Sequence, residues 1–122
     1  MKPLTYLCSP YSHPSPKMRE LRAQQAMEFY ARLRAAGYIV YCPIAHSHEA
    51  SEYMAAHGLP VMDSEWWREE NEAFLAHCDL LIVLCLDGWE QSKGVTREIE
   101  YAEKRGMRVL FLGYSAAIPE AA

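Results

Sequence analysis

The segment spanning residues 79–102 constrains the fold of this chain more than any other. It contains an unbroken apolar run from Leu80 to Leu86, which ends at an Asp-Gly turn signal. An apolar run of this length without alternation is typical of a strand whose two faces are both buried, as in a parallel sheet covered by helices. The sequence therefore predicts a central strand here, followed by a turn and a helix.

The helix that follows is predicted to begin near Gly94. Val95, Ile99 and Ala102 recur at i, i+4 and i+7, the spacing of a core-facing stripe. Glu98 falls on the same face. A carboxylate near a helix start often stabilises the helix by interacting with its macrodipole from an exposed position. The apolar spacing, however, predicts that Glu98 faces inward, which makes it the first catalytic candidate. We expect the positive end of the helix to keep it ionised, as suits a nucleophile.

Apolar strand patterns alternate with helical patterns along the rest of the chain. We expect strands at residues 4–8, 38–42, 80–86 and 108–112. We expect helices at residues 16–36, 63–77 and from 94 onward, with a His-rich loop or a short helix in 44–60. Such alternation means parallel pairing with right-handed crossovers, and hence a three-layer α/β sheet in the order 2-1-3-4. Residues 1–113 then form one domain, and residues 114–122 form a C-terminal tail.

Composition and charge narrow the class of partner. The 122 residues carry a net charge of −4 and no long basic run, so a nucleic-acid polymer is not an expected partner. The longest apolar run is far too short to cross a bilayer, and the first strand leaves no room for a signal peptide. The four cysteines include no Cys-x-x-Cys pair and lie in or beside apolar segments. We therefore expect buried, reduced thiols in a cytoplasmic protein.

The expected ligand crevice lies at the carboxyl ends of the first and third strands, where strand order reverses. The loops at residues 9–16 and 87–94 meet there. Arg22 and Asn71, like Glu98, interrupt otherwise apolar helix stripes. In the helix at 63–77 the stripe is expected to comprise Trp67, Phe74 and Cys78. One shared polar cavity would explain all three intrusions, although Arg22 and Asn71 could equally be edge residues that reach solvent.

Two further groups are candidates for binding. Ser92 and Gly94 offer a hydroxyl and free backbone N–H groups at a helix start, which makes an anion site, although a plain N-cap explains the same spacing. His46 and His48, with Cys42 upstream, are an incomplete set of metal ligands, so we expect no metal. A His46 that contacts substrate and a merely solvated histidine are both open alternatives.

Aromatic residues flank the expected crevice. Tyr6 and Tyr11 lie at the end of the first strand, and a phenol near Glu98 could orient its carboxylate by hydrogen bonding, although a strand tyrosine is usually core. Trp66 and Trp67 are adjacent on one helix, so both cannot face the same core. One of the two is expected to meet a partner subunit or the substrate.

Several of these residues fall into a pattern that resembles a known enzyme superfamily. The pattern comprises Tyr6-Leu7-Cys8-Ser9-Pro10-Tyr11 and, later, Asp87-Gly88-Trp89-x-x-Ser92-x-Gly94-Val95-x-x-Glu98. It resembles the nucleoside 2-deoxyribosyltransferases, above all their short bacterial and phage members. Residues 42–48 look like the same subgroup, so the resemblance covers most of the chain.

The resemblance implies a flavodoxin-like or Rossmann-like fold of four or five strands and chemistry at C1′ of a deoxyribose, with no cofactor. Glu98 matches the nucleophile of these enzymes, and Tyr6 the tyrosine that orients it. Ser92 matches a serine that helps to bind phosphate in relatives that hydrolyse nucleoside 5′-monophosphates. The other expected substrate contacts are Ser9, Tyr11, Arg22, His46, Asn71, Gly88, Trp89 and Gly94. Relatives complete their pockets with a neighbouring subunit, which implies a dimer or tetramer.

One position departs from the superfamily pattern. An aspartate thought to handle the proton of the leaving base should lie eight residues before the aspartate that matches Asp79, where this chain has Asn71. An amide cannot give up a proton to a base near neutral pH. Either Glu70, Glu72 or Asp63 serves instead, or the chain is a non-catalytic nucleotide-binding module on the same fold. A flavodoxin or receiver domain is a weaker third reading, because neither acidic residues nor a hydroxyl-rich loop follow the first strand.

Overall fold

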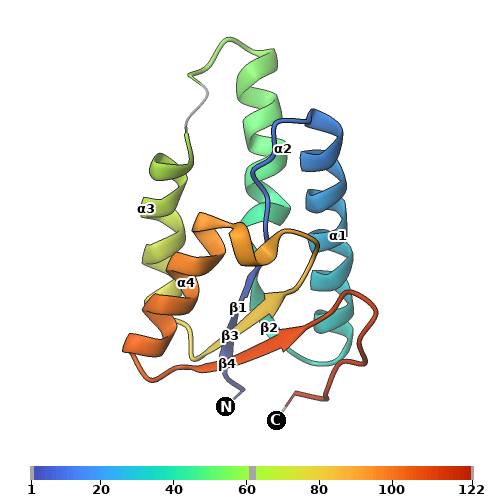
Figure 1. The fold of residues 1–122 in the computed structure, drawn as a ribbon, viewed down its shortest axis with the longest axis vertical. Coiled ribbons are helices and arrows are strands. Elements are labelled where there is room, and N and C mark those ends of the chain that lie inside the picture. The colour runs from blue at the N-terminus through green and yellow to red at the C-terminus, as the bar shows by residue number, and fades with distance from the viewer. Residues whose placement is uncertain (1, 61–62, 122) are drawn as a thin grey trace.

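The computed structural model describes residues 2–60 and 63–121 and shows one parallel sheet (Figure 1). Its strands are β1 (Leu4–Cys8), β2 (Ile39–Tyr41), β3 (Leu80–Leu84) and β4 (Arg108–Leu112). Their order is β2-β1-β3-β4, and every neighbouring pair is parallel. The predicted fold class and strand order are therefore confirmed, with four strands in the described part of the chain.

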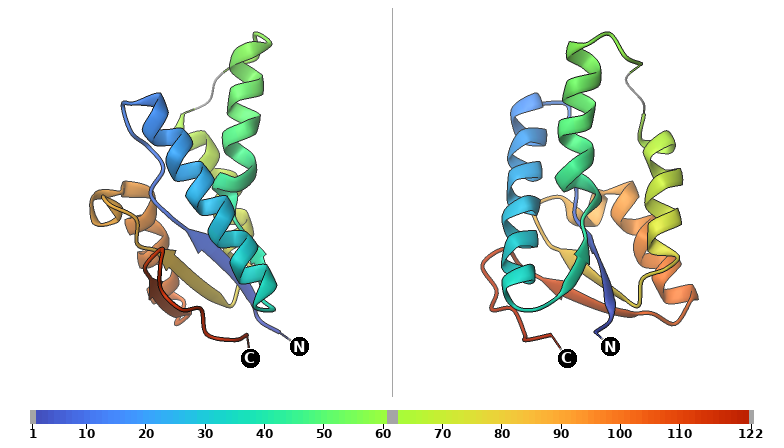
Figure 2. Two further views of the ribbon diagram at one scale, coloured as in Figure 1. Left: turned by 90° about the vertical axis from the view of Figure 1, so that its right-hand side faces the viewer. Right: turned by 180° about the vertical axis from the view of Figure 1, so that it is seen from behind.

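Helices cover both faces of the sheet and complete three layers (Figures 1 and 2). The helices are α1 (Pro16–Ala35), α2 (Pro43–Ala56), α3 (Ser64–Leu75) and α4 (Lys93–Lys104), with a short 3-10 helix, η1, at Trp89–Gln91. Alternate residues of β1 and β3 enter two separate hydrophobic clusters, one beneath α1 and one beneath α3 and α4. In the described part of the chain no helix is long and apolar enough to span a bilayer.

Strand β3 is the centre of the core, as its apolar run predicts. All five of its residues are buried, and it pairs with β1 on one side and β4 on the other. Each buried Leu, Ile or Val side chain stabilises the fold by roughly 1.5–3 kcal/mol relative to an exposed one. The segment can therefore only be accommodated in the middle of a sheet that is covered on both faces.

Helices α1 and α3 each begin at a residue whose side chain caps the helix. Ser15 Oγ accepts a hydrogen bond from the Met18 N–H at 3.4 Å, and Pro16 takes the first helical position of α1. Asp63 Oδ1 accepts from the Trp66 N–H at 3.0 Å at the start of α3. These side chains satisfy backbone donors that have no carbonyl partner within the helix.

The helix allowed for within residues 44–60 is present but longer than expected, because residues 43–56 form the 14-residue helix α2 and include the segment predicted as a His-rich loop. Pro43 occupies its first turn, where the fixed φ of proline favours a helix, but the N-cap Cys42 makes no side-chain hydrogen bond. Only Pro43 and Ile44 of this helix are buried, and α2 packs mainly on α1. With so short an apolar face and no capping side chain, the sequence pattern carried little helical signal.

The buried face of α3 also differs from the predicted stripe by one residue. Leu75 is fully buried, whereas Phe74 is 48% exposed and stacks on Tyr41 with 4.2 Å between ring centroids. The helix ends at Leu75, two residues earlier than expected. Helix α3 is therefore oriented so that Leu75, and not Phe74, faces the sheet.

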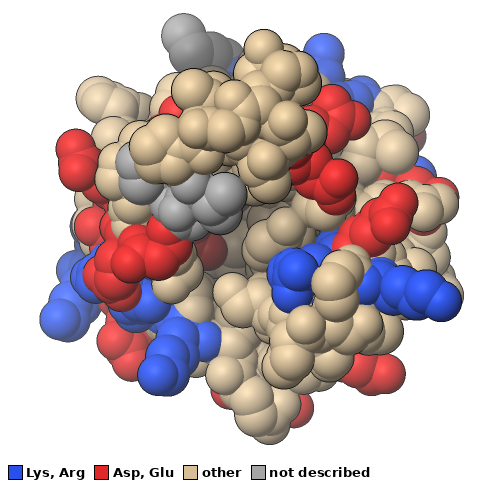
Figure 3. Space-filling model, turned by 90° about the horizontal axis from the view of Figure 1, so that it is seen from above, with Lys and Arg blue, Asp and Glu red and all other residues tan. Residues whose placement is uncertain are grey.

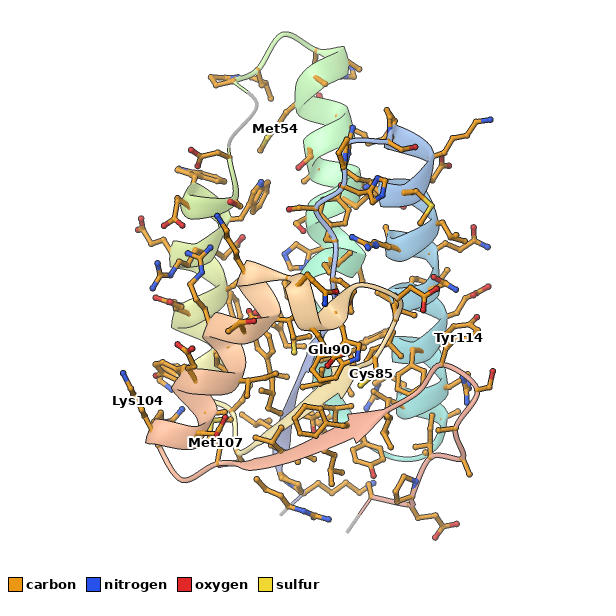
Figure 4. All side chains as sticks on the ribbon, viewed as in Figure 1. Met54, Cys85, Glu90, Lys104, Met107 and Tyr114 are labelled. Carbon is orange, nitrogen blue, oxygen red and sulfur yellow. The ribbon has the colours of Figure 1, made fainter. Side chains whose placement is uncertain are left out.

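The segment expected to be a tail lies against α1 and β2. Tyr114, Ile118 and Ala121 pack on the hydrophobic cluster beneath α1, and Figure 4 shows Tyr114 beside that helix. Tyr114 donates a hydrogen bond to Glu28, and the Tyr38 hydroxyl donates to the Pro119 carbonyl at 2.7 Å. Residues 114–121 are thus part of the folded domain.

Candidate active site

A cavity of about 1200 Å³ lies at the carboxyl ends of β1 and β3, walled by residues of all four helices. Figure 3 looks onto this end of the molecule and shows a hollow with charges of both signs around it. The loops that follow β1 and β3 both contribute to the wall, through Ser9, Tyr11 and Ser12 and through Gly88, Gln91 and Ser92. The crevice is therefore where the strand order predicts it.

Glu98 lines this cavity from α4 and is held by Tyr6 from β1. The Tyr6 side chain is fully buried, and its hydroxyl donates a hydrogen bond to Glu98 Oε2. On the same helix Val95 and Ala102 are buried in the core, so the apolar stripe carries the carboxylate inward. The second carboxylate oxygen, Oε1, is left to meet a ligand in the cavity.

Glu98 is less acidic than its place near a helix start predicts. Burial, which outweighs the opposing hydrogen bond from Tyr6, raises its pKa from 4.5 to about 7, with smaller contributions from the Glu72 carboxylate, which raises the pKa, and from Arg97, which lowers it. The prediction of a fully ionised carboxylate was therefore wrong. Ser92 is the N-cap of α4, so Glu98 lies beyond the first turn, where the macrodipole acts. Burial consequently dominates, and near neutral pH both protonation states are populated.

Tyr6 in turn keeps its proton over the physiological range. Burial raises its pKa well above 10, and the adjacent Glu98 carboxylate raises it further. A phenol that cannot ionise is a permanent hydrogen-bond donor to the carboxylate. Tyr6 therefore holds one oxygen of Glu98 in place and leaves the other oxygen of the carboxylate outside this hydrogen bond.

Ser92 and Gly94 bring the start of α4 to the same cavity. Ser92 Oγ accepts from the Val95 N–H at 3.2 Å, so the N-cap reading of this serine is confirmed. The hydroxyl retains a proton to donate, and the first backbone N–H groups of a helix have no intrahelical acceptor. Together these donors could hold an anionic group next to Glu98.

Arg22 joins the two loops of the cavity rim. Its Nη1 donates to the Ser12 carbonyl at 2.8 Å, and its Nη2 donates to the Asp87 carbonyl at 3.0 Å. The guanidinium also lines the cavity. Arg22 therefore fixes the position of both loops as well as adding positive charge to the wall.

Replacing Gly88 by alanine is expected to lower the free energy of unfolding by about 2–4 kcal/mol, as measured by urea denaturation. The residue has φ +88°, a conformation that costs an L-residue roughly 1–2 kcal/mol. A Cβ there would also lie 2.8 Å from Arg22 Nη2 and displace the loop-joining guanidinium. Gly106→Ala is the matched control, because Gly106 has φ +69° and open space around it. Equal losses in the two variants would contradict a stabilising role for the Arg22 bridge.

Two of the expected substrate contacts lie outside the cavity wall. His46 is exposed and its Nε2 lies 3.4 Å from the Tyr41 hydroxyl, whereas His48, two residues later, lines the cavity. The helical phase of α2 turns His48 rather than His46 inward. Trp89 packs on Phe111, with 5.5 Å between ring centroids, against the cluster beneath α4. Neither His46 nor Trp89 is placed to contact a ligand in the cavity.

Ser9 and Asn71 bring buried polar atoms to the cavity. Ser9 is 7% exposed, and neither its Oγ nor Asn71 Oδ1 has a hydrogen-bond partner among residues 2–60 and 63–121. Both residues line the cavity. A buried polar atom without a partner costs roughly 1–3 kcal/mol, so a ligand that supplies the missing partners would recover that free energy. Asn71 Oδ1 requires an N–H or O–H donor.

A metal centre is not apparent in residues 2–60 and 63–121, where no three His, Cys, Asp or Glu side chains are grouped to hold an ion. Cys42, which precedes His46 and His48 in the incomplete set of possible ligands, is buried, and burial raises the pKa of its thiol to about 11. Asp79 has a structural role, since its Oδ2 accepts a hydrogen bond from the Leu4 N–H at 3.0 Å.

Comparison with known proteins gives one family. A family model described as "Domain of unknown function (DUF1937)" matches residues 3–114. No curated protein matches the chain.

Proposed function

Since this chain belongs to DUF1937, a domain family of unknown function, we propose its activity from its site: cleavage of the N-glycosidic bond of a (deoxy)nucleoside 5′-monophosphate. The observation that carries the proposal is the hydrogen-bonded Tyr6–Glu98 pair, in which the buried Tyr6 holds a partly buried carboxylate that lines the cavity at the carboxyl ends of β1 and β3. The resemblance to nucleoside 2-deoxyribosyltransferases, which rests on the residues around this pair, supports it.

In the proposed reaction, ionised Glu98 attacks C1′ of the sugar through Oε1 while Tyr6 holds Oε2. The bond between C1′ and the base nitrogen breaks, and its electron pair leaves with the base. A glycosyl ester forms on Glu98, and water or a second base then attacks C1′ and releases the carboxylate. This is the retaining two-step scheme of glycosidases, which proceeds through a transition state with positive charge on the sugar.

The cavity offers matching groups for the rest of such a substrate. Ser92 and the backbone N–H groups near Gly94 would hold the 5′-phosphate at the start of α4. Ser9 and Asn71, whose buried polar atoms have no hydrogen-bond partner in the part of the chain that the structure describes, would meet hydroxyl or amino groups of the sugar or base. The resemblance also implies a homodimer or tetramer, which analytical ultracentrifugation would test, while the pattern of the cysteines favours a cytoplasmic protein.

The alternative is a nucleotide-binding module without catalysis, favoured by the amide at position 71. A panel of deoxynucleoside and ribonucleoside 5′-monophosphates separates the two functions. Chromatography would follow free base, and titration calorimetry would follow binding. Release of free base supports the glycosidase. Binding without release across the panel selects the binding module, and neither binding nor release contradicts both.

A further inference from the structure

Three side chains outside the Tyr6–Glu98 pair form a continuous hydrogen-bonded row on the cavity wall. The Tyr11 hydroxyl lies 2.7 Å from His48 Nδ1, and His48 Nε2 lies 3.0 Å from Glu52 Oε1. The rings of Tyr11 and His48 meet edge to face, at 72° and 5.6 Å. His48 and Glu52 are one turn apart on α2, while Tyr11 comes from the loop after β1. All three line the cavity that holds Glu98.

The row leads from the cavity to solvent. His48 and Glu52 also line a second, smaller cavity of about 380 Å³ between α1 and α2. The His48 side chain is 15% exposed, and the Glu52 side chain is 66% exposed. A proton taken up at the exposed end therefore has a hydrogen-bonded route to the Tyr11 hydroxyl at the other end.

Because imidazole Nδ1 can either accept or donate a hydrogen bond, the row can transfer a proton in either direction. An ionised Glu52 only accepts, so His48 Nε2 carries a proton and donates to it. In neutral His48, Nδ1 then accepts the Tyr11 proton, and the phenol presents an acceptor to the cavity. In the imidazolium, Nδ1 donates to the Tyr11 oxygen, and the phenol is free to donate its own proton to a ligand.

The proposed glycosidic cleavage needs such a donor, because the departing base must be protonated and Asn71 cannot do it. The other candidates near position 71 are engaged elsewhere. Asp63 caps α3 by accepting from the Trp66 N–H, and Glu72 pairs with Arg68 at 2.7 Å. Glu70 is not part of the cavity wall as the structure describes it.

We propose that Tyr11, His48 and Glu52 form the proton relay that protonates the leaving base, an inference that rests on the proposed glycosidase activity. As the C1′–N bond breaks, the Tyr11 hydroxyl proton moves to the base nitrogen. The His48 Nδ1 proton moves to the Tyr11 oxygen, and His48 becomes neutral. In the second half-reaction the attacking water returns a proton along the same path. Glu52 orients and electrostatically stabilises the imidazolium throughout.

Charged side chains on every neighbouring element face the relay. On α2 and α1, His48 and Tyr11 are faced by Glu49, Glu52, Glu20 and Arg19. Across the main cavity the charged or titratable side chains of α3 and α4 are Arg68, Glu72, Lys93, Arg97 and Glu98. Burial raises the pKa of Tyr11, so the phenol passes protons on without being ionised at rest.

The test compares two substrates in Tyr11→Phe, His48→Asn and Glu52→Gln variants. One is a purine deoxynucleoside 5′-monophosphate that the protein cleaves, and the other is its 7-methylpurinium counterpart, whose base already carries a positive charge and leaves without a proton. For the ordinary substrate, kcat is expected to fall by about 10²-fold or more in Tyr11→Phe and His48→Asn, and less in Glu52→Gln, with loss of one limb of the pH profile. With the methylated substrate, kcat should return to within about threefold of the wild type.

Matched controls come from the end of α2 and its C-cap residue. Tyr53 and His57 stack on each other at 3.9 Å and lie outside the cavity wall, so Tyr53→Phe and His57→Asn should leave both rates unchanged. Equal losses on both substrates, or no loss on either, would overturn the relay while leaving the glycosidase intact. A wild type that cleaves neither substrate, or Glu98→Ala with undiminished turnover, would instead reject the function on which the relay rests.

Discussion

Replacement of Glu98 by alanine is expected to reduce release of free base by about 10³-fold or more, with little change in nucleotide binding. The variant removes the oxygen that forms the bond to C1′, and the loss of a covalent nucleophile typically falls on kcat rather than on KM. Single-turnover kinetics with a cleavable deoxynucleoside monophosphate would measure the effect. Mass spectrometry of the wild type, quenched during turnover, should show the glycosyl adduct on Glu98.

Two further variants make this expectation specific. Glu100→Gln changes an exposed carboxylate on the same helix and should leave turnover unchanged. Tyr6→Phe removes the hydrogen bond that opposes the raised pKa of Glu98, so the rising limb of the pH profile should move to higher pH. Full turnover in Glu98→Ala would exclude this carboxylate as the nucleophile.

Replacement of Glu98 by glutamine is expected to stabilise the protein above pH 7 and to remove part of its pH dependence. The pKa of Glu98 is about 7 in the folded chain, against 4.5 as the ordinary value. A group whose pKa is raised by folding contributes stability that is complete below pH 4.5 and is lost as the pH rises to about 7. Above pH 7 the fold must hold an ionised, largely desolvated carboxylate, which glutamine does not require.

The expected size is about 2–3 kcal/mol, from a shift of about two and a half pKa units with allowance for the partial exposure of the residue. Urea denaturation at pH 4.5, 6 and 8 would measure it as the difference between Glu98→Gln and the wild type. That difference should grow with pH in favour of the variant and level off above pH 7. A difference that does not change with pH would show that Glu98 has an ordinary pKa.

The central part of the fold was predictable because buried strands carry their own signal. Residues 80–84 have no polar side chain, and only a sheet covered on both faces accommodates them. The phase of α4 was predictable for the same reason, since Val95 and Ala102 fix which way Glu98 points. The position of Glu98 could therefore be predicted from the pattern of core residues. It is a carboxylate at a helix position where the apolar periodicity leads us to expect an apolar residue.

The remaining differences arise where tertiary contacts outweigh local pattern. Helix α2 buries only two residues, so its sequence lacks an apolar stripe, and its phase, which selects His48 over His46, is set by packing on α1. The protonation of Glu98 depends on how much water reaches its oxygens, a property of the whole cavity rather than of its neighbours in sequence. The row from Tyr11 to Glu52 joins a loop to helix α2. Tyr11 and His48 are 37 residues apart, and no spacing in the sequence predicts that they form a hydrogen bond.

Lys2 and Ala121 both form hydrogen bonds to the turn after α1, which lies at the opposite end of the sheet from the cavity (Figure 1). Lys2 Nζ donates to the Gly37 carbonyl at 2.9 Å, and the Ala121 N–H donates to the Ala36 carbonyl at 3.4 Å. A fluorophore or a surface anchor attached near residue 2 or residue 121 would therefore leave the mouth of the cavity accessible. The protein can therefore be immobilised through either position and screened for ligands that enter the cavity.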